Sequence, residues 1–226
     1  TKTMPGDGTW VNFKVALDGE SKTYNVWMDD ELIVENGSHN VTNTANSFQI
    51  DHSGIGGNAM IDNLLIGSCE NLGTAAPSEP TPSEPAASVQ PPEFDNIYLN
   101  ENFEGDSISV SLLKKGLSND SGTNVNEVRK DGDNSYVHME SYLGGADYTK
   151  IYKSLSSVID SKKVLISVDV ATTKLATLHI KFGSFAFVSY GGDGVLSSGS
   201  NPIAGATKTM PGDGTWVNFK VALDGE

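Results

Sequence analysis

Carboxylates and histidines are the side chains of this 226-residue chain that could carry catalysis. The densest acidic group, Asp29, Asp30 and Glu31, follows a strand-like run and is typical of a solvated turn. Retaining glycoside hydrolysis needs two carboxylates about 5 Å apart, which same-face positions of one strand can provide, whereas this group follows the strand-like run. The four histidines show no short metal-ligand spacing. We therefore expect a protein that is not an enzyme.

Aromatic side chains beside polar groups indicate a different chemistry, the binding of sugars. A flat ring packs against the apolar face of a sugar, and nearby amides or carboxylates bind its hydroxyl groups. Trp27 alternates away from the apolar positions of the run TYNVWMD and shares a face with Asn25 and Asp29. The competing interpretation is that the strand is bulged and Trp27 belongs to the core.

Tyrosines beside glycine-rich loops are further candidates for a sugar-binding groove. Four of them have this position in the sequence: Tyr142, Tyr148, Tyr152 and Tyr190. Together with Trp27, Asn25 and Asp29, we assign Tyr142, Tyr148 and Tyr190 to the predicted binding site.

The chain that carries these residues has a repeating sequence. Residues 1–20, TKTMPGDGTWVNFKVALDGE, recur without change at residues 207–226. The period is the size of a domain, far longer than the 20 to 50 residues of a solenoid unit. The repeat therefore predicts tandem modules, unless the duplication was introduced artificially.

A proline-rich segment marks the boundary between modules. Six of the nine prolines lie between Pro77 and Pro92, in a stretch with almost no large apolar residues. Such a composition predicts an extended spacer that cannot fold on its own. We expect residues 1–72 to be the C-terminal part of one jelly-roll module, residues 73–93 the linker, and residues 94–226 the N-terminal part of an equivalent module.

One strand position per module cannot hold both copies of the duplicated segment. The chain can fold back on itself with one copy displaced. Alternatively, each half is completed by a neighbouring chain, in a head-to-tail association that continues without closing. The linker is long enough for both arrangements.

Charge and cysteine content narrow the range of partners. The formal net charge of −14 repels nucleic acid and anionic membrane surfaces, so we expect neither as a partner. No run approaches the roughly 20 apolar residues of a membrane span, so membrane insertion is not expected. Cys69 is the only cysteine and is expected to be a small buried residue near a strand end.

Short apolar or alternating runs separated by Gly, Asn, Asp and Ser predict an all-β fold. Examples are KVLISVDV, TLHIKFG, FAFVSYGG and VNFKVALD, and no long stretch has a helical period. Alternation along these runs gives each strand one apolar and one polar face. The pattern predicts an antiparallel sandwich of two sheets.

Three motifs carry a resemblance to a known family. NENFEG, GTWVNFKVALD followed by TYNVWMDDELI, and MIDNLLIG resemble the concanavalin A-like jelly roll of laminin-G-type domains, lectins and bacterial carbohydrate-binding modules. The resemblance implies that the first and last strands of a module pair, which would place NENFEG beside IDNLLI. Catalytic members of the family carry the pattern E-x-D-x-x-E, which this sequence lacks.

The pairing that the resemblance implies would also gather hard oxygen ligands. Glu101 and Glu104 would meet Asp62 and Asn63, and calcium prefers such ligands. Related modules often carry a structural calcium ion at this place, so we expect one here.

These features together predict a non-catalytic carbohydrate-binding module of a secreted or cell-surface multimodular bacterial protein, with a polysaccharide as ligand. Weak sugar contacts gain avidity when linked copies bind one polymer. The alternative is a structural stalk or filament repeat of a surface adhesin, assembled by strand exchange between modules.

Overall fold

The computed structural model describes thirteen segments of the chain. They comprise residues 11–18, 22–28, 31–40, 47–53, 57–73, 91–115, 122–142, 148–155, 163–173, 177–190, 196–198, 201–202 and 213–223. Within these segments every regular element is a β-strand. Accordingly, none of them contains a helix that could cross a bilayer.

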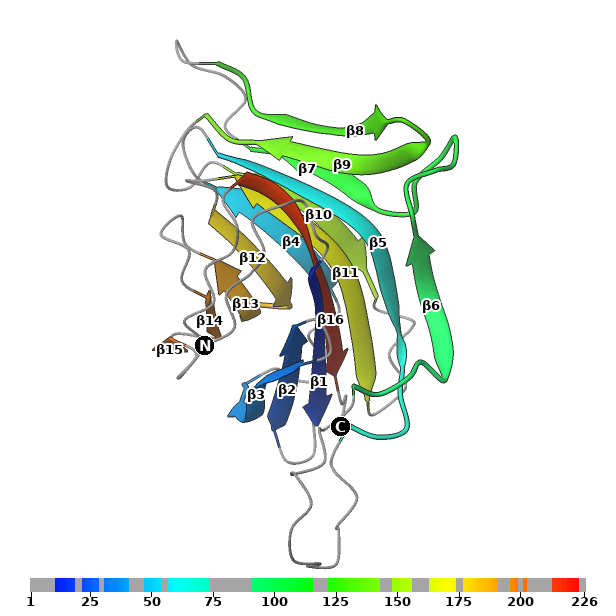
Figure 1. Ribbon diagram of the computed structural model, residues 1–226, viewed down its shortest axis with the longest axis vertical. Coiled ribbons are helices and arrows are strands. Elements are labelled where there is room, and N and C mark those ends of the chain that lie inside the picture. The colour runs from blue at the N-terminus through cyan, green and yellow to red at the C-terminus, as the bar shows by residue number, and fades with distance from the viewer. Residues whose placement is uncertain are drawn as a thin grey trace, which may run out of the picture.

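The strands form two sheets (Figure 1). The larger, nine-stranded sheet runs in the order β3 (Glu31–Ser38), β2 (Thr23–Met28), β1 (Val11–Asp18), β16 (Asp213–Leu223), β11 (Val164–Thr173), β5 (Asn58–Ser68), β9 (Asn134–Glu140) and β8 (Val125–Asp131). Its ninth strand, β6 (Asn96–Glu101), pairs with the second half of β5. The seven-stranded sheet runs in the order β15 (Asn201–Pro202), β14 (Leu196–Ser198), β13 (Phe185–Tyr190), β12 (Thr177–Phe182), β4 (Ser47–Ser53), β10 (Thr149–Ser154) and β7 (Ser111–Lys114). Only β1 and β16 pair in parallel among the described strands.

The two sheets pack on one hydrophobic core. In β12, Leu178, Ile180 and Phe182 are buried, whereas the residues between them are partly exposed. Alternate residues of β11 in the other sheet, such as Ile166 and Val168, belong to the same buried cluster. Because side chains alternate across a strand, each sheet turns one apolar face inward. The prediction of an all-β, two-sheet sandwich is confirmed.

Residues from both sides of the proline-rich segment build this sandwich. Strand β4 lies between β12 and β10, and β5 pairs antiparallel with β6. The β5–β6 pairing sets Leu64 opposite Glu101, so NENFEG begins beside IDNLLI as predicted. Where the structure describes the ends of the predicted linker, Gly73, Pro91 and Pro92 are buried.

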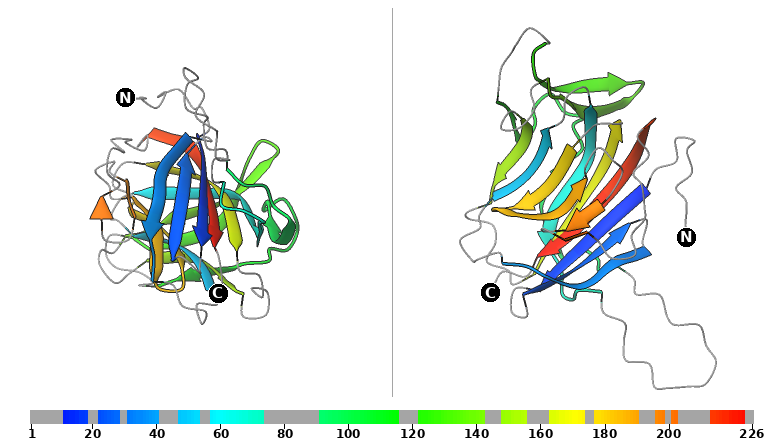
Figure 2. Two further views of the ribbon diagram at one scale, coloured as in Figure 1. Left: turned by 90° about the horizontal axis from the view of Figure 1, so that it is seen from below. Right: turned by 90° about the vertical axis from the view of Figure 1, so that its left-hand side faces the viewer.

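The two copies of the duplicated segment lie side by side in the nine-stranded sheet, as β1 and β16 (Figures 1 and 2). Both pair antiparallel with β11, and both also pair with β2. Where they touch each other, Val11 is opposite Val217 and Asn12 is opposite Asn218, so each residue faces its own counterpart. Both copies therefore occupy the region between β2 and β11.

Candidate functional site

Two of the predicted tyrosines are linked by hydrogen bonds through Asn124 and Lys115. The Oδ1 of Asn124 accepts a hydrogen bond from the Tyr142 backbone N–H at 2.8 Å. Its Nδ2 donates to the Lys115 carbonyl, and the Lys115 N–H donates to the Tyr148 carbonyl at 2.8 Å. The Tyr142 ring covers Gly122, where a Cβ atom would lie 2.6 Å from the ring, so the ring requires glycine there.

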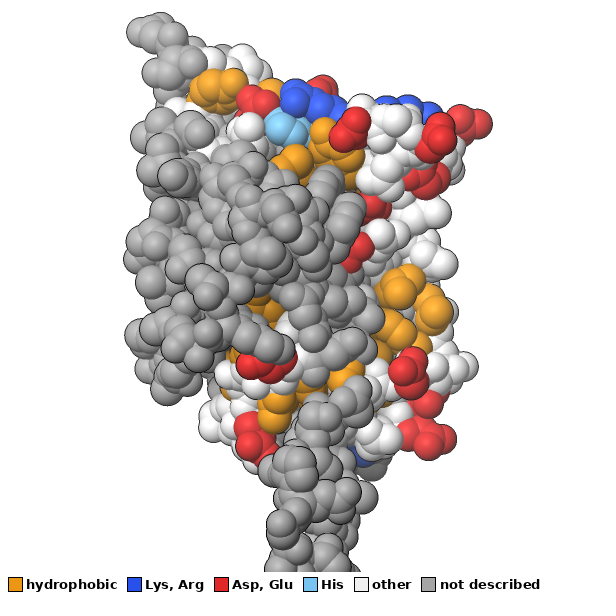
Figure 3. Space-filling view, viewed as in Figure 1, with side chains coloured by type: hydrophobic (Ala, Val, Ile, Leu, Met, Phe, Trp, Pro, Cys, Tyr) orange, Lys and Arg blue, Asp and Glu red, His pale blue; other side chains and the backbone are white. Residues whose placement is uncertain are grey.

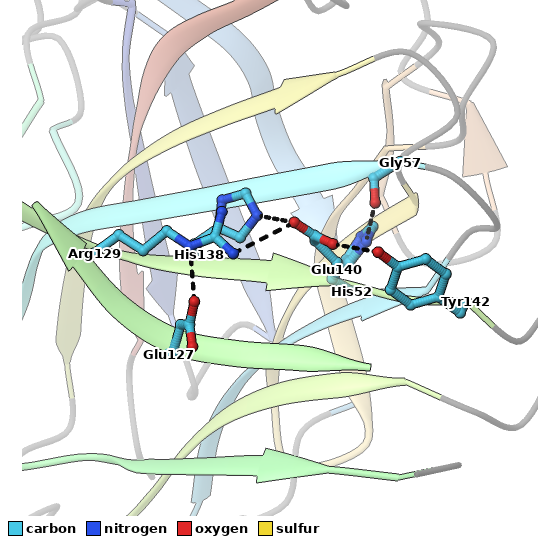
Figure 4. Close-up of polar contacts among 7 residues, drawn as sticks. All are labelled: His52, Gly57, Glu127, Arg129, His138, Glu140 and Tyr142. Atoms are coloured by element: carbon cyan, nitrogen blue, oxygen red, sulfur yellow. Dashed lines mark hydrogen bonds and ion pairs between the residues drawn. The ribbon is translucent and has the colours of Figure 1, made fainter. Parts of the chain in front are cut away.

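Tyr142 belongs to a polar group on β8 and β9 that we call the Glu140 cluster, drawn in Figure 4. Its members are Glu127, Arg129, His138, Glu140 and Tyr142. The Tyr142 hydroxyl donates to Glu140 Oε2 at 2.8 Å, and His138 Nε2 lies 2.6 Å from Glu140 Oε1. Arg129 Nε donates to Glu127 Oε1 at 2.8 Å, and its Nη2 lies 3.6 Å from Glu140 Oε1.

These contacts keep the Glu140 carboxylate charged. Burial alone would raise the pKa of Glu140, but the hydrogen bonds from His138 and Tyr142, with the nearby Arg129, outweigh it and lower that pKa. The hydrogen bond to Glu140 raises the pKa of the Tyr142 hydroxyl. A carboxylate with a lowered pKa is a poor general acid but a good hydrogen-bond acceptor. Figure 3 shows acidic, basic and histidine side chains gathered where β8 and β9 lie.

A second polar group covers the outer face of the seven-stranded sheet, and we call it the Asp51 row. It consists of Gln49, Asp51, Lys150, His179 and Lys181. Lys150 Nζ donates to Gln49 Oε1 at 2.7 Å and lies 3.8 Å from Asp51 Oδ1. Lys181 forms a close ion pair with Asp51 Oδ2. The sheet register sets both Lys150 and His179 opposite Asp51.

Strand β10 adds aromatic rings to this row. Thr149 and Ile151 are buried, so the alternating residues Tyr148, Lys150 and Tyr152 share the outer face. Tyr148 lies within cation–π range of two lysines, with Lys150 Nζ 4.8 Å and Lys115 Nζ 5.3 Å from the ring centroid. Tyr152 is opposite Gln49 of β4.

The histidine of the row is mainly neutral near pH 7. Burial, and then the positive charge of Lys181, lower the pKa of His179. Its Nδ1 lies 2.8 Å from the Ser189 hydroxyl on β13. The row thus presents an amide, ammonium groups and a neutral imidazole along one face, and the buried Asp51 carboxylate pairs with both lysines.

The prediction that Trp27 contacts a ligand is wrong. Trp27 does lie on the face opposite Val26 and Met28, as the alternation predicts, but its side chain is 0 % exposed. It packs in a separate buried cluster with Cys69 and Leu165, against Leu32, Leu72 and Phe94. The chain segments that flank the linker therefore cover this part of the sheet.

Asn25 is buried with Trp27 and is engaged within the fold, so it too is not available to a ligand. Its Nδ2 donates to the Leu72 carbonyl at 3.1 Å, and its Oδ1 accepts from the Asn36 N–H at 2.7 Å. Asp29 and the side chain of Tyr190 lie outside the described part of the chain. Cys69 is buried just after β5, as predicted.

The four predicted calcium ligands separate into three places. The carboxylate of Glu101 binds the backbone N–H groups of Phe103 and Ser109 and so holds the turn after β6. Asn63 Nδ2 donates to Asp169 Oδ2 at 2.7 Å on β11.

Asp62 and Glu104 are the two predicted ligands that approach each other. Asp62 accepts from Asn134 Nδ2 at 3.1 Å, and Glu104 binds the N–H and the hydroxyl of the next residue, Ser135. Burial, and to a smaller extent the charge of Glu104, raise the pKa of Asp62. The described residues contain no group of three or more His, Cys, Asp or Glu residues that could hold a metal ion. The calcium site at Glu101, Glu104, Asp62 and Asn63 stays a prediction, and the structure describes these residues as bonded to other protein groups.

Comparison with known proteins finds no matching family model, no matching curated protein and no matching solved structure. The chain is therefore described by its fold alone, as a β-sandwich protein that carries the Glu140 cluster and the Asp51 row. The resemblance to a concanavalin A-like jelly roll stays a prediction.

Sequence reasoning missed the Asp51 row, although a signal for it exists. The runs NSFQID, TKIYKS and TLHIKF alternate, and Gln49, Asp51, Lys150, His179 and Lys181 occupy their polar positions. Alternation shows that these side chains share outer faces, but only the order of β10, β4 and β12 in the sheet brings them together.

His52 on β4 is a fully buried histidine. Its Nδ1 is 3.1 Å from the Thr177 carbonyl oxygen and its Nε2 is 3.0 Å from that of Gly57. A neutral imidazole can donate to only one of them, whereas the charged form could donate to both. Burial nevertheless dominates and lowers the pKa of His52.

Replacing Trp27 tests its assignment to the core. We expect Trp27→Ala to lower the free energy of unfolding by about 3–5 kcal/mol, because a buried indole is lost and a cavity remains. Trp27→Phe should cost clearly less. Urea unfolding followed by circular dichroism measures both. A Trp27→Ala variant as stable as the wild type would contradict the buried position.

Lowering the pH tests the neutral state of His52. Below pH 6.5 the unfolded chain takes up a proton that the native imidazole, with its lowered pKa, does not yet bind. The free energy of unfolding should therefore fall as the pH falls from 6.5, by at most about 1.4 kcal/mol per pH unit from this group. His52→Gln should flatten the profile measured by urea unfolding between pH 7 and 5. Equal slopes for both proteins would refute the assignment.

Proposed function

We propose that the chain is a non-catalytic carbohydrate-binding module of jelly-roll type that binds an uncharged polysaccharide on the outer face of the seven-stranded sheet. The module would act in a secreted or cell-surface protein. One observation carries the proposal: Lys150 and Tyr152 of β10 share a face with Gln49 and Asp51, and Tyr148, just before β10, packs against Lys150.

This face has the two kinds of group that a sugar requires. Tyr148 and Tyr152 are four positions apart, a span of about 13 Å along a strand. Between them in the sequence, the ammonium group of Lys150 can donate hydrogen bonds to hydroxyl groups. The amide of Gln49, opposite Tyr152, accepts from Lys150 at 2.7 Å and donates to the Gly183 carbonyl at 2.6 Å, so it holds Lys150 in place. Rings supply contact area for the apolar face of a sugar, and the polar groups fix its orientation.

The charge of the chain favours an uncharged ligand. The net charge of −14 repels polyanions. Asp51 pairs with both lysines of the row, so the row presents no large excess of either sign. A neutral polymer is bound through hydrogen bonds and rings without having to displace these ion pairs.

A structural stalk or filament repeat is the second candidate function. The burial of Trp27 favours it, because the residue that best fitted a sugar platform belongs to the core. The pairing of both duplicated strands with β11 favours it as well.

Affinity gel electrophoresis against starch, xylan, pectin and cellulose tests the binding proposal. We expect retardation by at least one of starch, xylan and cellulose but not by pectin, whose carboxylates make it a polyanion, and weaker retardation of Tyr152→Ala. Loss of one ring contact of roughly 1.4 kcal/mol corresponds to about tenfold weaker binding.

Tyr98→Ala is the matched control, because Tyr98 is 36 % exposed on β6 and belongs to the other sheet. This variant should migrate like the wild type. If starch, xylan and cellulose all fail to retard the wild-type chain, or if both tyrosine variants behave alike, the binding proposal fails.

A further inference from the structure

We propose that the strand position between β2 and β11 is an acceptor site for a strand from a second copy of this chain. We call it the acceptor position. The donor is the copy of the duplicated segment, residues 1–20 or 207–226, that does not fill the acceptor position of its own molecule.

The register of the two copies carries this inference. Phe13 and Phe219, which are counterparts in the duplicated segment, both pair with Val168 of β11. Lys14 and Lys220 both pair with Ser167 of β11. Both lysines also pair with Trp27 of β2. The two copies thus select the same partners on both sides, without a shift of one residue.

Only one copy can form the complete ladder in one molecule. Along each edge of a strand, the backbone N–H and C=O groups of alternate residues can bond to one neighbouring strand. Strand β5 lies on the other edge of β11, so β1 and β16 compete for the remaining edge. In the described structure the pairs are divided: β1 forms six with β2 and four with β11, whereas β16 forms nine with β11 and one with β2.

A second copy of this chain is the partner that fits the acceptor position. The position selects a strand by its register and by alternating side chains, which is how an added strand gains affinity and specificity in a sheet. A copy that is left over has the sequence that the position accepts. Because a donor on one molecule meets an acceptor on the next, the contact is head-to-tail and can continue.

Proline substitutions at equivalent residues provide the test. Proline removes the backbone N–H and cannot join a ladder with strands on both sides. Lys14→Pro and Lys220→Pro each disable one copy, and the double variant keeps an acceptor position without a donor. The double variant Lys14→Ala and Lys220→Ala controls for the loss of the lysine side chains.

We expect each single proline variant, and the alanine control, to keep a cooperative urea-unfolding transition, and the double proline variant to lose it. Refolding the double variant together with wild-type chain should yield a soluble 1:1 complex of twice the monomer mass by light scattering. Refolding it with either single variant should yield no such complex, because those chains have no spare copy.

The same mixtures can overturn the proposal. Loss of cooperative unfolding in either single variant would show that the copies are not interchangeable. A double proline variant as stable as the wild type would show that the acceptor position needs no donor. Absence of the complex with wild-type chain, or equal amounts with wild-type and single-variant chains, would refute donation between molecules.

Discussion

The edge of β11 that faces β2 offers a single row of backbone hydrogen bonds, and the chain contains two identical segments that fit it. Residues Leu165 to Val168 are paired with both segments in the same register. The side chains of these β11 residues are buried, so the strand beside them completes the sheet over the centre of the core. The arrangement of the whole molecule therefore depends on which segment forms this ladder.

The burial of both faces of β2 follows from the same arrangement. Val26 and Met28 point into the core between the sheets, while Trp27 packs beneath the chain on either side of the linker, with Leu72 and Phe94. The pairing of β5 with β6 brings these flanking segments together. The face of the nine-stranded sheet at β2 is thus occupied by protein. We propose the outer face of the seven-stranded sheet as the ligand surface instead, because partly exposed polar side chains and Tyr152 lie there.

The sequence was sufficient to predict the fold class but only part of the site. Alternation predicted the strands, the two-sheet sandwich and the orientation of Trp27 away from Val26. It could not show that residues 69–72 and Phe94 cover Trp27, because that contact joins segments far apart in the chain. The Asp51 row was missed for the same reason, since its side chains come from three strands that are adjacent only in the folded sheet. Resemblance predicted the β5–β6 pairing, but Glu101 binds its own turn and Asn63 binds β11.

Amide hydrogen exchange measured by mass spectrometry can show whether one or both of the duplicated segments form the ladder on β11. Because the two segments are identical in sequence, peptic peptides from within them have the same mass and are observed together. If one segment forms the ladder in each molecule, a short labelling pulse should give two isotope envelopes of equal size, one protected and one exchanged. A single protected envelope would show both segments in complete ladders at once, and would contradict their competition for one edge of β11.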